Sequence, residues 1–279
     1  LKAGRFFVDF GKQMQAHIEE LDTIERPLVL REYLGEELAG DGLQWDYWLP
    51  AGERTVLRTS IGAFASLLAH EHGEESDEDA HLEPVTPERV DFDQINYTAR
   101  LTGFTELGAL ATLQAGMSLR AIPSYGYQSD ELDVKDLSNR VYGIDLTYGR
   151  ADATHTRYLA IGAEWLFNDG DLAAKSAPDS ESGYQLVNDR ANGYYAWMTW
   201  RWNQFNQLLF QFSRAEVVSE AADMALEQVG ELDINYTRHL SEFLRLRACY
   251  TRVDATPSAH RFAIQLTALI GPHGHGLNW

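Results

Sequence analysis

The chain has 279 residues, of which 42 are acidic and 23 basic, and its formal net charge is −19. This charge excludes nucleic acid as a partner, because binding to phosphates requires a basic surface. The single cysteine excludes an intrachain disulfide framework. No apolar run approaches the roughly 20 residues of a transmembrane helix.

Segments in which apolar and polar residues alternate recur along the whole chain. Side chains point to opposite faces along a strand, so each segment predicts a strand with one apolar and one polar face. In the last segment Phe262, Ile264 and Leu266 share one face, and Gln265 and Thr267 share the other. The predicted strands, about twelve in number, are 1–10, 43–49, 54–66, 92–104, 109–122, 139–150, 156–167, 192–203, 206–214, 229–238, 242–252 and 259–270.

The connections between these strands alternate between short and long. In outer-membrane barrels the short turns are periplasmic and the long loops lie outside. Aromatic residues near the strand ends are typical of membrane-interface girdles, although aromatic residues favour any strand. We therefore predict an all-β, antiparallel transmembrane β-barrel that forms one domain over 1–279. The short connections are 50–53, 105–108, 151–155, 204–205 and 239–241, and the long ones are 11–42, 67–91, 123–138, 168–191, 215–228 and 253–258.

The polar faces of the predicted strands would line the interior of the barrel, and they carry charges of both signs. Opposed rows of charge favour the passage of small polar solutes or ions. Charges that only pair with one another would instead plug the interior, and the sequence leaves both readings open. The predicted pore-lining residues are Arg58, Arg100, Arg120, Asp145, Glu164, Arg201, Glu231, Asp233, Arg245 and Arg247.

The first long connection, 11–42, is too apolar for a flexible loop tip, because its residues 28–34 include five apolar side chains that require burial. We expect this loop to fold into the lumen or its mouth as a constriction. Its charged residues Arg26, Arg31 and Glu32 would then define the passage, with the two arginines facing acidic wall residues. The alternative is a packed extracellular cap.

The second long connection contains a dense group of histidines and carboxylates between residues 70 and 81. Imidazole and carboxylate ligands suit zinc and similar divalent metals. The spacing is not that of a preformed site, so we expect weakly bound zinc at most, and the alternative is a solvated acidic loop. His273 and His275 in the C-terminal tail are a further metal candidate or a simple tether. The candidate ligands in the loop are His70, His72 and His81.

The sequence offers little for catalysis. It contains no nucleophile elbow, zinc-protease motif or phosphate-binding loop. His260 lies near Thr256 and Ser258, which is the nearest approach to a paired nucleophile and base. We expect no enzymatic activity and no cofactor beyond weakly bound zinc.

Several segments look like parts of a known family, namely residues 4–12, 15–17, 26–29, 34–37 and 271–275. They resemble a family of porin-like outer-membrane proteins of Gram-negative bacteria, some of which are labelled zinc-regulated, TonB-dependent outer-membrane proteins. The resemblance implies an outer-membrane barrel in a Gram-negative bacterium with a link to zinc supply. It also implies His17 as a candidate zinc ligand.

We therefore predict a porin-like channel for the passive passage of small solutes or ions through the outer membrane. The alternatives are a protein for capture and uptake of zinc or other divalent metals, and a closed-lumen barrel for surface binding or adhesion. The expected partners are outer-membrane lipid, small solutes or metal ions, and the barrel assembly machinery. Because the sequence opens at Leu1 inside a strand and shows no signal peptide, we expect upstream residues and about 14–16 strands in the complete protein.

Overall fold

The computed structural model describes residues 1–17, 20–35, 37–67, 83–85, 94–128, 133–175, 184–219, 225–255 and 257–268. Nearly all regular structure in these residues is β-strand, and α1 (Leu28–Leu34) is the helix among them. No helix in these ranges is long and apolar enough to span a membrane. The strands are β1 (Lys2–Phe7), β2 (Ala39–Pro50), β3 (Thr55–Ser66), β4 (Glu83–Val85), β5 (Asn96–Glu106), β6 (Ala111–Gln128), β7 (Asp133–Ala151), β8 (Tyr158–Lys175), β9 (Tyr184–Asn203), β10 (Asn206–Ser219), β11 (Ala225–His239), β12 (Leu244–Asp254) and β13 (Ala259–Ala268).

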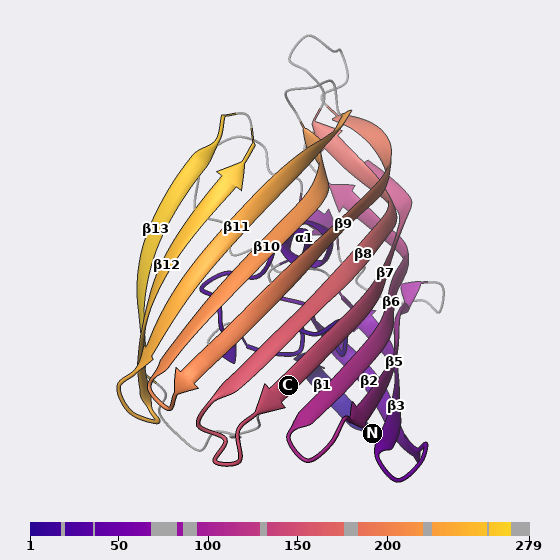
Figure 1. Ribbon diagram of the computed structural model, residues 1–279. Coiled ribbons are helices and arrows are strands. Elements are labelled where there is room, and N and C mark those ends of the chain that lie inside the picture. Colours follow the sequence, from indigo (N-terminus) through magenta and orange to yellow (C-terminus); the bar gives the residue numbers. More distant parts are fainter. Residues whose placement is uncertain are drawn as a thin grey trace.

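All strands belong to one antiparallel sheet, in the order β1-β2-β3-β5-β6-β7-β8-β9-β10-β11-β12-β13. The three-residue strand β4 lies off this path and pairs with β6. The sheet curves around α1, which lies on its concave side (Figure 1). β1 and β13 form the two edges, and no pairing joins them in the part of the chain that the structure describes. The predicted all-β antiparallel fold is confirmed.

The two faces of the sheet differ sharply in chemistry. On paired strands β7 and β8, Ile144 lies opposite Trp165 and both are about 60% exposed, at 61% and 60%. The next pair, Asp145 opposite Glu164, is only 2% and 1% exposed on the concave side. The period of two along each strand therefore places apolar side chains outside and polar side chains inside.

The strands are longer at one end of the sheet than we predicted. β8 and β9 pair as far as Lys175 opposite Tyr184, inside the predicted connection 168–191. The predicted connections 123–138 and 215–228 are likewise largely strand. The predicted long connection 253–258 has its first two residues in β12, which leaves only 255–258 between β12 and β13. The predicted alternation of short and long connections is therefore wrong in large part. The extension of β8 over 168–175 lacks alternating apolar residues, so its backbone pairing leaves no signal in the sequence.

The first strand is shorter than the predicted range 1–10. β1 ends at Phe7, and the chain then turns to the concave side, where Val8 and Phe10 are fully buried. Gly11 follows with φ +55°, a left-handed conformation that favours glycine. Residues 8–38, called the inward segment below, replace the predicted connection 11–42. β4 also falls within a predicted connection, 67–91.

Candidate functional site

The inward segment packs its apolar side chains against the concave face of the sheet. Phe10, Val29, Leu30 and Leu34 are all fully buried. They belong to one apolar cluster with wall residues from β3 and β7 to β10. The wall residues of this cluster include Phe64, Val141, Leu166, Ala191, Tyr195, Trp197 and Ala215.

A glycine in the wall allows α1 to approach closely. A Cβ atom added at Gly193 of β9 would lie 2.6 Å from Cγ2 of Val29 and 2.7 Å from the carbonyl oxygen of Arg214. Real Cβ atoms do not approach other heavy atoms this closely, so any larger residue here would displace the helix or the neighbouring strand. The wall is therefore shaped to receive the inward segment.

Both ends of α1 are set by local sequence and by the wall. Pro27 precedes the helix with φ −52°, and Gly35 ends it with φ 79°. Pro suits a helix start because it has no N–H to satisfy, and Gly suits a C-terminus because it adopts a positive φ. The N–H of Val29 donates to Oγ of Ser213 at 3.2 Å. The hydroxyl of Tyr33 donates to a carbonyl of β10 at 2.9 Å.

The segment's first turn is anchored by polar groups of the wall. The N–H of Gly11 donates to Oγ of Ser118 at 3.0 Å, and the N–H of Lys12 donates to Oε2 of Glu164 at 3.2 Å. The hydroxyl of Tyr195 donates to the same carboxylate oxygen at 2.6 Å. Burial lowers the pKa of Lys12 to about 8, although the nearby acidic side chains oppose this shift.

Two arginines hold the start of the segment through Asp9, which is 4% exposed. Arg58 contacts Asp9 at 2.8 Å, and Arg100 contacts it at 3.5 Å. The same arginines bridge to the wall, from Arg58 to Asp46 at 2.6 Å and from Arg100 to Asp145 at 2.8 Å. These residues form a chain of alternating charge between β2, β3, β5, β7 and the segment.

A second charged network lies on the opposite side, against β11 and β13. Arg31 donates to both carboxylate oxygens of Glu231 at 2.8 Å and to Glu25 at 2.6 Å. Arg261 contacts Glu231 at 3.0 Å and Glu25 at 3.2 Å. The four side chains form a closed set of two positive and two negative charges, in which each arginine contacts both glutamates.

The other two residues predicted for the constriction have different positions. Arg26 is 1% exposed and donates to the carbonyls of Gln13 and Ala16, at 2.5 and 2.6 Å. It therefore ties together two turns of the inward segment. Glu32 lies within α1 and is exposed.

The structure places all ten predicted pore-lining residues on the concave side. Seven are buried, and Arg58, Arg201 and Arg245 are half-buried. Arg247 donates to the carbonyls of Leu21 and Thr23 of the inward segment. Whether these residues line an open passage stays a prediction. The seven buried residues are Arg100, Arg120, Asp145, Glu164, Glu231, Asp233 and Arg247.

A cavity of about 330 Å³ separates the inward segment from the wall at β11 to β13. The segment contributes residues 23–25 to its lining, and the wall contributes mainly polar side chains. The cavity adjoins the network of Arg31, Glu25, Glu231 and Arg261. Its lining residues are Thr23, Ile24, Glu25, Asp233, Asn235, Cys249, Thr251, Arg261, Phe262 and Ala263.

Most of the candidate metal ligands cannot be placed, because they are not among the residues that the structure describes. His70, His72 and His81, as well as His273 and His275, lie outside the described residues. His17 packs edge-on against Phe7, with ring centroids 4.4 Å apart. Among the described residues, no group of three or more histidine, cysteine, aspartate or glutamate side chains could hold a metal ion. Zinc binding stays a prediction.

The sequence patterns did not predict several residues of this site. Asp9 and Lys12 lie next to or within the predicted first strand, so their role as anchors of an inward turn was not foreseen. Gly11 was the available signal, because a glycine within an alternating run often marks a break. The cavity residue Thr23 carried no signal, since nothing in the sequence relates it to β11.

Comparisons with known proteins show distant similarity. No family model matches the chain. An uncharacterised protein of Aquifex aeolicus (strain VF5) is 22% identical over 290 residues, which covers 98% of this chain and 59% of that protein. The chain thus spans about three fifths of the length of this curated relative.

Two solved structures match the chain at low sequence identity. The outer-membrane OmpT of Vibrio cholerae matches with a TM-score of 0.49 and 11% identity, over 90% of this chain and 65% of that one. The outer membrane channel DcaP of Acinetobacter baumannii matches with a TM-score of 0.48 and 13% identity, over 95% and 68%. The antiparallel sheet itself, with its apolar outer and polar inner face, carries the arguments that follow.

Proposed function

We propose that the chain forms a β-barrel in the outer membrane of a Gram-negative bacterium and acts as a channel for small solutes or ions. The observation that carries this proposal is the inverted distribution of side chains. Large apolar side chains are exposed on the outer face of nearly every strand, whereas charged and polar side chains are buried inside. A water-soluble protein buries its apolar face, so this arrangement suits a sheet surrounded by lipid.

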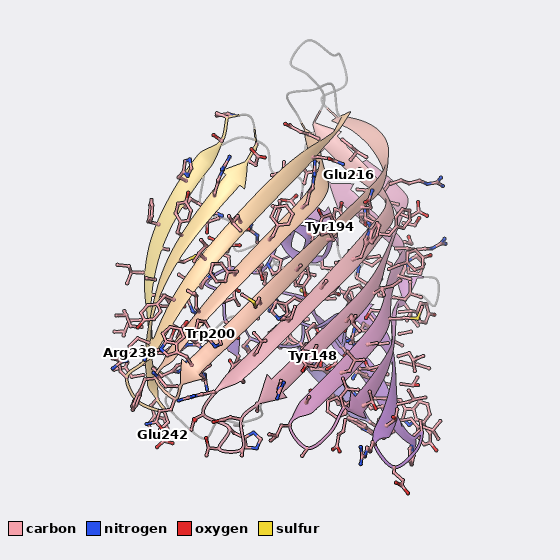
Figure 2. All side chains as sticks on the ribbon, viewed as in Figure 1. Tyr148, Tyr194, Trp200, Glu216, Arg238 and Glu242 are labelled. Carbon is pink, nitrogen blue, oxygen red and sulfur yellow. The ribbon has the colours of Figure 1, made fainter. Side chains whose placement is uncertain are left out.

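The positions of aromatic residues support a membrane setting. Figure 2 shows Tyr148 and Trp200 toward the end of the sheet with the short turns, and Tyr194 closer to the opposite end. Trp200 packs against Trp202, with ring centroids 5.3 Å apart. Amphipathic aromatic rings favour the two headgroup regions of a bilayer.

The strand lengths fit the same setting. A tilted strand needs about 9–11 residues to cross the hydrocarbon, and β2 and β3 have 12 residues each. β6 to β9 have 18 to 20 residues. The longer strands would extend the barrel beyond the bilayer on the side opposite the short turns.

The inward segment supports a role in setting the size of the passage. It fills much of the concave side along β3 and β7 to β10 with apolar contacts and leaves the cavity along β11 to β13. A lining with both signs of charge favours small polar solutes over large or apolar ones. The inward segment would then act as the predicted constriction rather than as an external cap.

Conductance in planar bilayers tests the proposal. The purified protein should insert from detergent and produce discrete current steps. The steps should grow when residues 10–34 are replaced by a short glycine–serine linker, because this removes most of the inward segment. A protein that stays soluble without detergent and ignores lipid vesicles would contradict the membrane assignment, and a silent bilayer would contradict the channel.

The tight anchoring of the inward segment favours one further candidate, a closed-lumen barrel for surface binding. The segment is tied to the wall by ion pairs on β3, β5 and β11 and by hydrogen bonds on β6, β8, β10 and β12. The same conductance measurement decides between the two functions, since a closed barrel gives no steps before the segment is removed and steps afterwards.

Zinc capture by the loop at 70–81 remains a separate proposal that rests on its sequence. Zinc titration of the protein with and without this loop tests it, and equal affinities for the two forms would remove it.

A further inference from the structure

The cavity between residues 23–25 and the wall contains two buried polar side chains without protein partners. Asn235 on β11 is 1% exposed, and neither its Nδ2 nor its Oδ1 has a hydrogen bond within the part of the chain that the structure describes. Thr23 on the inward segment is 2% exposed, and its Oγ1 also lacks a hydrogen bond there. Both side chains line the cavity, one from each side.

Unsatisfied polar groups in a buried position are costly, so such groups usually have a partner. A carboxamide and a hydroxyl both donate and accept hydrogen bonds. The cavity therefore offers uncharged hydrogen-bond donors and acceptors. A molecule that binds there should also carry groups that donate and accept hydrogen bonds.

Two of the charged groups at the cavity are already held in ion pairs. Arg261 and Glu25 belong to the closed network with Arg31 and Glu231. A charged solute would have to displace one of these ion pairs before it could bind to Arg261 or Glu25. The network thus disfavours simple anions at Arg261 and simple cations at Glu25.

Asp233 completes the set of groups available to a solute. Its Oδ1 accepts from Thr251 at 2.5 Å, and its Oδ2 accepts from Gln211 at 3.3 Å. A carboxylate has about four lone-pair positions, so each oxygen can accept one further hydrogen bond. Asp233 and Asn235 share one face of β11 two residues apart, which places an acceptor beside a donor and acceptor.

We propose that this cavity is a binding site for a small, neutral, polyhydroxylated solute of about monosaccharide size. Adjacent hydroxyls of such a solute would donate to Asp233 and exchange hydrogen bonds with Asn235 and Thr23. A volume of about 330 Å³ lies at the lower end of the range for small-molecule sites, roughly 300–1,000 Å³. The inference names a solute class for the proposed channel, and to that extent it rests on the proposed function.

The single cysteine provides a test on the unaltered protein, because Cys249 lines the cavity and is half-buried. The rate at which a small neutral thiol reagent modifies Cys249 is measured in detergent with glucose, choline or acetate at equal concentrations. Glucose should slow the modification with a saturable dependence on concentration, and choline and acetate should leave the rate unchanged. A rate that does not respond to glucose, or that responds equally to choline or acetate, overturns the proposal.

Equilibrium dialysis of labelled glucose measures binding directly. It can be applied to variants, and it does not depend on the reactivity of Cys249. Asn235→Leu and Thr23→Val should each weaken binding about threefold to tenfold, the range expected for losing one hydrogen bond. The matched controls are Asn96→Leu and Thr147→Val. Asn96 and Thr147 are also buried on the concave side with an unpartnered oxygen, but they do not line the cavity.

The controls should bind glucose as the unaltered protein does. Equal losses in the controls, or the absence of saturable binding in the unaltered protein, would refute the site. Binding in detergent does not require an open channel. Glucose binding without conductance would therefore contradict the proposed channel and support the binding site. Conductance without glucose binding would support the channel and contradict the binding site.

Discussion

The inward segment meets the sheet in two different ways on its two sides. On one side, along β3 and β7 to β10, Phe10, Val29 and Leu30 are buried in an apolar cluster. On the other side, along β11 to β13, the contacts are ion pairs such as Arg31 to Glu231, and the cavity lies beside them. We refer to these as the apolar side and the polar side.

The difference indicates that the two sides of the inward segment have different roles. Close apolar packing fixes the position of the segment, because every displaced atom loses contacts and leaves a void. The other side is held by ion pairs beside a cavity of about 330 Å³, so it is packed less tightly and stays polar. We therefore expect changes on the apolar side to affect stability most, and changes on the polar side to affect the passage of solutes.

The largest effect should come from Phe10→Ala on the apolar side. Removing a fully buried phenylalanine side chain costs about 3–5 kcal/mol, which denaturant unfolding in detergent measures. Phe212→Ala is the control, because Phe212 lies on the outer face and is 40% exposed. Similar losses for the two variants would show that the segment is not packed as described.

A smaller loss is expected from Gly193→Ala, which inserts a methyl group against Val29. Overpacking of this kind costs about 1–3 kcal/mol, which appears as a lower midpoint of denaturant unfolding in detergent. Gly230→Ala is the control, since a Cβ there would meet its nearest neighbour at an ordinary 3.7 Å. An unchanged unfolding midpoint for Gly193→Ala would contradict the close approach of helix and wall.

On the polar side, Arg31→Gln leaves Glu231 with Arg261 as its remaining cation contact in the network. Breaking a fully buried pair costs about 3–5 kcal/mol, but Arg31 is partly exposed and a second arginine remains, so we expect about 1–2 kcal/mol. Losing one positive charge should also raise the permeability of cations relative to anions, measured from reversal potentials. Arg190→Gln, in an exposed pair with Asp169, should change neither quantity.

The last prediction concerns pH and Lys12, whose pKa is lowered by burial from 10.5 to about 8. Between these values the unfolded chain binds a proton that the folded protein lacks, so this residue makes stability rise with pH over that window. Below pH 8 both states are protonated, and the full cost of the buried charge is present.

Thermal unfolding midpoints of the unaltered protein and of Lys12→Met, measured from pH 7 to 10.5, check this expectation. The deficit of the unaltered protein relative to the variant should shrink as pH rises above 8. A constant difference across this range would show that Lys12 titrates normally.

Periodicity was sufficient to predict the fold but not the ends of its strands. Leu43, Trp45 and Tyr47 alternate with polar residues and lie on the outer face as expected. Val8 and Phe10 continue the same alternation after β1, yet they belong to the inward segment and are buried. Alternation shows that two residues share a face, but it does not show whether that face meets lipid or another part of the protein. The extensions of β8 and β9 pair through backbone groups, which leave no side-chain pattern.

The interior was predictable only as a set of residue types. The alternation rule places Arg100, Asp145 and Glu231 on the polar face, but their partners depend on register and on the path of the inward segment. Arg31 reaches Glu231 across 200 positions of sequence. No local pattern encodes such a contact, and the same holds for the cavity that Thr23 and Asn235 share.

These long separations also bear on how the protein reaches its folded state. The carbonyls of Thr23 and Leu21 accept from Arg247, which lies 224 and 226 positions later in the chain. Contacts between such distant positions form late and slow folding, because a long stretch of chain must first be ordered. The inward segment precedes β2 to β13 in the sequence, whereas its partner Arg247 lies on β12, near the other end of the sheet order. We therefore expect the docking of the inward segment against β12 to be a late step of folding, which follows the pairing of neighbouring strands, so that its removal would leave those earlier steps unchanged.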